Sequence, residues 1–175
     1  MRALGPGSVS SVLKVILDVV YHALWVLIAV LIVGVVIGFI AVMAPATLQS
    51  LVHNSRGQLA LDSAPTALFE IASTALYTLG IAIIIGRLRQ LFAALTAGDP
   101  FHPDNVRRLQ VIALVLGALE AGRIVASIIA GLVHLRSQSM GGLNLTAWFA
   151  VLVVFVLAEV FREGARLRRE AELTI

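Results

Sequence analysis

Apolar residues fall into four long runs along this chain, separated by polar segments. The runs cover about 16–43, 67–86, 111–134 and 143–160. A bilayer core about 30 Å thick needs about 20 apolar helical residues, and only helices satisfy their own backbone groups in lipid. The pattern therefore predicts an all-α, polytopic membrane protein with four transmembrane helices, packed as one four-helix bundle over residues 1–175.

The first run admits a second interpretation, because Ala44-Pro45-Ala46 resembles the cleavage site of a signal peptide. The apolar region of a signal peptide has about 7–15 residues, and this run is longer. We therefore expect it to remain as a span.

The second helix is predicted to continue past the membrane. Its extension repeats apolar residues on one stripe, as an amphipathic helix does. Gly98 is a natural residue to end it, and Asp104 is the candidate N-cap of the third helix. We therefore expect a cytoplasmic hairpin over 87–108. The apolar stripe consists of Leu88, Leu91, Phe92 and Leu95.

The segment 161–175 shows the same design and is predicted to extend the fourth helix into the cytoplasm as a tail. Three charged pairs have the spacing of helical ion pairs. This stripe and that of the second helix either pack together or form a surface for a partner. The stripe comprises Val160, Gly164, Leu167 and Ala171, and the pairs are Glu163–Arg166, Arg166–Glu170 and Arg168–Glu172.

Composition agrees with a membrane protein, since 59% of the residues are hydrophobic and 13% charged, against about 25% charged in soluble domains. Ten basic residues lie in the N-terminal segment, the hairpin and the tail, whereas Arg56 and Arg136 lie in the other loops. This bias predicts both termini in the cytoplasm. We expect a bacterial inner membrane protein, N-in and C-in, whose arginines set topology and bind no nucleic acid directly. The ten are Arg2, Lys14, Arg87, Arg89, Arg107, Arg108, Arg162, Arg166, Arg168 and Arg169.

Glu120 and Arg123 are charged residues inside the third span. A charge at the bilayer centre costs about 3 kcal/mol on insertion scales, and residues three apart on a helix neutralise each other. The pair is either a structural ion pair, shared with Glu70, or a site that handles a proton or substrate.

Small residues recur four apart in two spans: Gly34 and Gly38 in the first, and Gly117 with Ala121 or Ala118 with Gly122 in the third. This spacing lets helix backbones approach closely. Packing within the molecule and formation of a homo-oligomer are both consistent with it.

Chemistry-bearing motifs are few. The chain has no cysteine, which excludes disulfides and thiolate metal sites, and it contains none of the common hydrolase, phosphate-loop or dinucleotide motifs. Asp18 and His22 have helical pair spacing, but His53, His102 and His134 lack the spacing of metal ligands. We predict no enzyme, no cofactor and no metal.

Two cytoplasmic segments carry a family resemblance: GDPFHPDNVRRLQ at 98–110 and LAEVFREGARLRREAELTI at 157–175. Together they resemble the paired signatures of the domain-of-unknown-function 2975 family, small bacterial membrane proteins with four predicted spans. The family has no assigned activity. Many members are encoded beside a small helix-turn-helix regulator, which implies signalling or sequestration at the inner membrane. Arg169 departs from the family pattern, where a second acidic residue is common.

The preferred hypothesis is a regulatory or interaction protein that presents a cytoplasmic helical face to a partner such as that transcriptional regulator. The alternative is a small transporter or channel that uses Glu120 and Arg123. The lipid bilayer is expected to surround the spans in either case. The predicted face consists of Arg87, Arg89, Asp99, Phe101, Asn105, Phe161, Arg162, Glu163, Gly164, Leu167, Glu170, Leu173 and Ile175.

Overall fold

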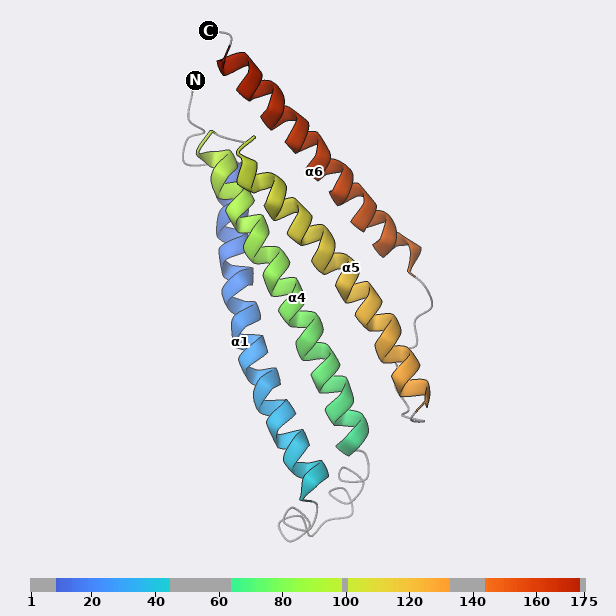
Figure 1. Ribbon diagram of the computed structural model, residues 1–175. Helices are drawn as coiled ribbons and strands as arrows, with labels where there is room; N and C mark the ends of the chain where they lie inside the picture. Colours follow the sequence, from blue (N-terminus) through green and yellow to red (C-terminus); the bar gives the residue numbers. More distant parts are fainter. Residues whose placement is uncertain (1–8, 45–63, 99–100, 133–143, 174–175) are drawn as a thin grey trace.

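A computed structural model gives the chain four long α-helices that follow one another in alternating directions (Figure 1). The structure describes residues 9–44, 64–98, 101–132 and 144–173. Each helix is long and apolar enough to cross a membrane, which confirms the prediction of an all-α protein with four such helices. The helices are α1 (Val9–Met43), α4 (Ala64–Thr96), α5 (Pro103–Leu132) and α6 (Leu145–Glu172).

The helices pack as a row in chain order. α1 lies against α4, α4 against α5 and α5 against α6, and no other helix pair in the described ranges shares a comparable interface (Figure 1). We expected a four-helix bundle without specifying the order of its helices, and the structure arranges them as an open row. Because lipid is as apolar as leucine, no hydrophobic force draws α1 and α6 together to close a ring. Most of the large apolar side chains of both flanking helices are exposed to the surroundings.

Small residues bring neighbouring helices together. A Cβ atom on Gly38 would lie 3.2 Å from Leu68 of α4, and one on Gly34 would lie 3.4 Å from Ile71. The two glycines therefore pack within the molecule. Gly80 of α4 is in closer contact, since a Cβ there would lie 2.5 Å from a methyl carbon of Leu119 on α5.

The start of α1, the end of α4, the start of α5 and the end of α6 lie at the same end of the molecule (Figure 1). We call this the arginine-rich end. α4 stops here because Gly98 adopts a positive φ of 82°, as expected of the residue that ends a helix. The expected N-cap at Asp104 is wrong. α5 already begins at Pro103, whose fixed φ suits the first helical position, and the His102 ring accepts a hydrogen bond from the Asp104 amide.

α6 is displaced along α5 toward the arginine-rich end. The amide of Asn144, which caps α6, lies 3.3 Å from a carboxylate oxygen of Glu120, near the middle of α5. At 1.5 Å per residue, α5 continues about 18 Å beyond this point to Leu132. At the other end, Gly164 lies beside Phe101 of the hairpin, so the last two turns of α6 pass beyond it.

Candidate functional site: the hairpin and the end of α6

The hairpin between α4 and α5 is attached to α6 by an aromatic contact. The rings of Phe101 and Phe161 lie 5.7 Å apart between centroids, within the range of favourable aromatic pairs. A Cβ on Gly164 would lie 2.6 Å from two carbons of the Phe101 ring. Only glycine leaves room for the ring at this position. We call this contact the hairpin–tail junction.

A small apolar core lies beneath the junction. It joins three helices through Leu91, Leu109 and Ala158, with Leu88, Leu95, Val154 and Phe161 packed around it. Most of the predicted stripe of α4 is therefore used inside the molecule. The predicted apolar stripe of α6 is only partly used inside the molecule, because Gly164 contacts Phe101 while Val160 and Leu167 remain exposed.

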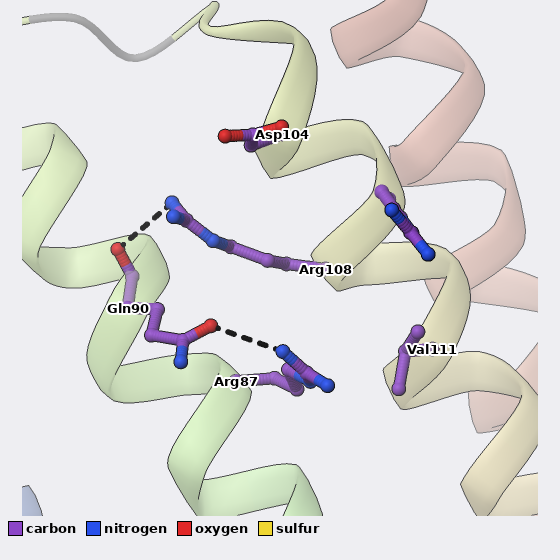
Figure 2. A pocket seen from close by; sticks show the side chains of 6 residues that line it. Arg87, Gln90, Asp104, Arg108 and Val111 are labelled. Carbon is purple, nitrogen blue, oxygen red and sulfur yellow. Dashed lines mark hydrogen bonds between the residues drawn. The ribbon is translucent and has the colours of Figure 1, made fainter.

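Polar contacts hold the start of α5 to the end of α4. Asn105 is fully buried, and its side-chain oxygen accepts a hydrogen bond of 2.7 Å from Arg108. The same Arg108 nitrogen donates to the backbone oxygen of Gln90 on α4 (Figure 2). Asn105 was expected on the cytoplasmic interaction face, but its full burial leaves no surface for a partner to touch. It positions Arg108 instead.

Arg89, also expected on that face, is engaged by α1. Its guanidinium forms an ion pair with Asp18 and lies 4.5 Å above the centre of the Tyr21 ring. The His22 ring contacts the backbone oxygen of Asp18. The Asp18 carboxylate, which the spacing offered as a partner for His22, forms its ion pair with Arg89 instead. The sequence pattern gave no signal for this contact because it depends on how α1 and α4 are aligned.

The end of α6 is charged and open. Two of the predicted ion pairs form, with 2.7 Å between Arg166 and Glu163 and 3.4 Å between Arg166 and Glu170. A third, unpredicted pair joins Arg162 and Glu159. Leu167 is 54% exposed and projects from this charged surface. Leu173 is also exposed, whereas Asp99, Ile175 and the side chain of Glu172 lie outside the described residues.

Glu120 and Arg123 form a bidentate ion pair in the middle of α5. The nitrogen–oxygen distances are 3.1 Å and 2.6 Å, and the Glu120 side chain is 8% exposed. The same carboxylate accepts the Asn144 amide at the start of α6. Glu70, the expected third partner, forms no ion pair among the residues the structure describes. The third partner of the pair is instead the backbone amide of Asn144. The sequence could not predict this contact, because nearly every residue has a backbone amide.

Metal ligands do not gather anywhere in the described ranges, where no group of three histidine or acidic residues is close enough to hold an ion. His102 and Asp104 approach to 3.6 Å at the start of α5, but both side chains are exposed. His53 and His134 lie outside those ranges.

Comparison with known proteins identifies the family. A family model described as "Protein of unknown function (DUF2975)" matches residues 52–175, more than half of the chain. The chain belongs to the DUF2975 family. Comparisons with curated proteins and with solved structures gave no match. The match covers α4, α5 and α6, and α1 lies outside it. Both segments that resemble DUF2975 signatures therefore lie within the matched region, and Phe101, Phe161 and Gly164 bring them into contact.

Proposed function

We propose that this DUF2975 protein is a regulatory or interaction protein of the bacterial inner membrane, N-in and C-in, that binds a soluble cytoplasmic partner. The distribution of arginine supports the orientation, since ten of the thirteen basic residues belong to the N-terminal segment, the hairpin and the tail. The arginine-rich end is then the part of the protein that cytoplasmic proteins reach.

The observation that carries the proposal is the exposed end of α6. Beyond the hairpin–tail junction, every residue from Arg166 to Ala171 is exposed, including the apolar Leu167. This stretch is too charged to lie among lipid tails, and no other described helix covers it. An amphipathic helix of this kind fits a groove of another protein, with the apolar residue as the anchor.

The junction gives this surface a defined shape. Phe101 packs on Phe161 and Gly164, so the hairpin and the end of α6 form one continuous surface. A partner would contact Phe101, which is 38% exposed, together with the outer turns of α6. A small helix-turn-helix regulator is the partner class that the family implies, and signalling would require two arrangements of this surface.

The transporter alternative receives less support from the geometry of the Glu120–Arg123 pair. Both carboxylate oxygens of Glu120 are used, one by Arg123 alone and one by Arg123 together with the Asn144 amide. A carboxylate that fixes the position of α6 is suited to holding the helices in register. We therefore assign the pair a structural role.

The test is a cross-linked pull-down from native membranes, read by mass spectrometry. It compares the intact protein with a form lacking residues 166–175 and with Leu167→Asp. Arg169→Gln serves as the matched control, because residues two apart point to opposite sides of a helix.

We expect a soluble partner with the intact protein and with Arg169→Gln, and at least tenfold less of it with Leu167→Asp at equal abundance in the membrane. Recovery that does not depend on Leu167 would contradict the proposal. If only the truncated form loses the partner and it also leaves the membrane, the end of α6 is structural.

A further inference from the structure

A cleft of about 340 Å³ opens between α4 and α5 at the arginine-rich end. Pockets that bind small molecules have volumes of about 300–1,000 Å³, so this one has room for a small polar group. Three arginines and one carboxylate surround it. The lining residues are Arg87, Gln90, Asp104, Arg107, Arg108 and Val111 (Figure 2).

None of the three arginines is neutralised by a carboxylate of the described residues. Arg87 donates to the side-chain oxygen of Gln90, and Arg108 donates to two neutral oxygens, those of Gln90 and Asn105. Arg107 has no partner among the residues that the structure describes. Asp104 is directed to His102 at 3.6 Å. Among the described residues, the lining of the cleft therefore carries three positive charges and one negative charge.

The apolar residues next to the cleft indicate what kind of anion fits. On α4, Ile83 and Leu76 lie four and eleven residues before Arg87 and share its helix face. On α5, Leu114 lies seven residues after Arg107 and shares its face. These side chains are 40%, 66% and 62% exposed, so no helix of the described chain covers them. A cationic cleft thus continues into an uncovered apolar surface directed toward the membrane interior.

We propose that this cleft binds the phosphate headgroup of an anionic phospholipid, with its acyl chains along Ile83, Leu76 and Leu114. Arginine binds phosphate through paired N–H donors, and Arg107 and Arg87 have donors to spare. Arg108, fixed by Asn105 and Gln90, holds its charge at the wall of the cleft. This assignment is independent of the soluble partner proposed above, because it uses α4 and α5 and leaves Leu167 of α6 free.

The test uses the full-length protein in a neutral detergent, titrated with phosphatidylglycerol and with phosphatidylcholine of the same acyl chains. Native mass spectrometry measures the fraction of protein that retains lipid. The variants are Arg107→Gln and Arg87→Gln. Arg169→Gln is the matched control, since it removes the same charge from the exposed end of α6. Inorganic phosphate added as a competitor separates a lipid site from a site for free phosphate.

We expect tighter binding of phosphatidylglycerol than of phosphatidylcholine. One arginine near a membrane surface contributes about fivefold in affinity for anionic lipid, so Arg107→Gln and Arg87→Gln should each weaken binding about fivefold. Arg169→Gln should not change it. Equal losses in all three variants would overturn the proposal, because they would indicate a general effect of charge. Displacement of the lipid by millimolar inorganic phosphate would also overturn it, in favour of a soluble anion.

Arg107 is exposed and makes no hydrogen bond or ion pair with the described residues, so we expect its replacement to leave the folded protein available for measurement. An unchanged unfolding midpoint of Arg107→Gln in the absence of anionic lipid verifies this. Added phosphatidylglycerol should then raise the midpoint of the wild-type protein and of Arg169→Gln more than that of Arg107→Gln. An equal rise in all three would contradict the site.

Discussion

The carboxylate of Glu120 is the most buried charge in the described part of the protein. The loss of stability on its removal depends on the groups that it binds. Glu120→Gln leaves the Arg123 guanidinium without this carboxylate, and Arg123→Gln leaves the carboxylate without this guanidinium. Breaking one side of a buried pair is more harmful than replacing both. We expect each single variant to lower the unfolding midpoint by about 5 °C, and Glu120→Gln/Arg123→Gln to recover part of the loss.

Thermal unfolding in detergent checks this prediction at the residue scale. If the losses of the two single variants simply add in the double variant, the side chains do not interact as an ion pair. Unchanged midpoints in both single variants would contradict the structural role of the pair.

Gly164 provides a second prediction at this scale, because alanine there has no room beside Phe101. Gly164→Ala favours the helical state of α6, so α6 itself should remain intact while the Phe101 ring is displaced. An aromatic pair contributes about 1 kcal/mol beyond its burial. We therefore expect backbone amides at 101–105 to exchange hydrogen about fivefold faster, measured by mass spectrometry of peptides from the hairpin.

Gly122→Ala is the control for Gly164→Ala, since nothing lies within 4 Å of a Cβ added at Gly122. It should leave hairpin exchange unchanged. Equal exchange in Gly164→Ala and in the wild-type protein would mean that the ring contact does not hold the hairpin.

Among the helices, the α4–α5 interface depends on the contact of Gly80 with Leu119. A Cβ at Gly80 would meet three carbon atoms of Leu119 at 2.5–2.9 Å, and overpacking of this kind costs about 1–3 kcal/mol. We expect Gly80→Ala to reduce the free energy of unfolding by this amount, measured by denaturant titration in mixed micelles. Gly80→Ala/Leu119→Ala should be less affected than the sum of its parts, because the smaller side chain makes room.

The elements themselves were largely predictable from the sequence, because bilayer thickness fixes how long an apolar helix must be. Gly98 also marked the end of α4 correctly, since a positive φ favours glycine. The position of α6 along α5 was not predictable. It depends on a bond between Glu120 and the amide of Asn144, and a backbone donor is present at almost every residue of every sequence.

The candidate site was predictable only in part, for a related reason. Phe101, Phe161 and Gly164 belong to the two segments that suggested the family, and they meet in the structure. Asn105 and Arg89 belong to the same polar stretches, yet the first is buried and the second is paired with Asp18. Residue type alone does not distinguish a polar side chain that meets solvent from one that joins two helices.

At the scale of the whole molecule, most basic residues belong to the segments of the arginine-rich end. This bias predicts an orientation in the membrane that can be tested. The chain has no cysteine, so a single introduced thiol is a specific label. Arg169→Cys places it at the arginine-rich end, and Ala44→Cys places it at the end of α1 on the opposite side of the membrane. The arginine bias predicts that a membrane-impermeant maleimide reacts with Ala44→Cys in intact spheroplasts and with Arg169→Cys only in inverted vesicles.

Labelling after solubilisation controls for the reactivity of each thiol, because both positions then meet the reagent equally. The opposite pattern would place the end of α6 outside the cell, and a cytoplasmic regulator would have no access to Leu167. The lipid cleft would survive that result, since anionic phospholipid reaches a site at either surface of the bilayer. A reversed orientation would therefore exclude the cytoplasmic partner and leave the lipid cleft, whereas the expected orientation is compatible with both proposals.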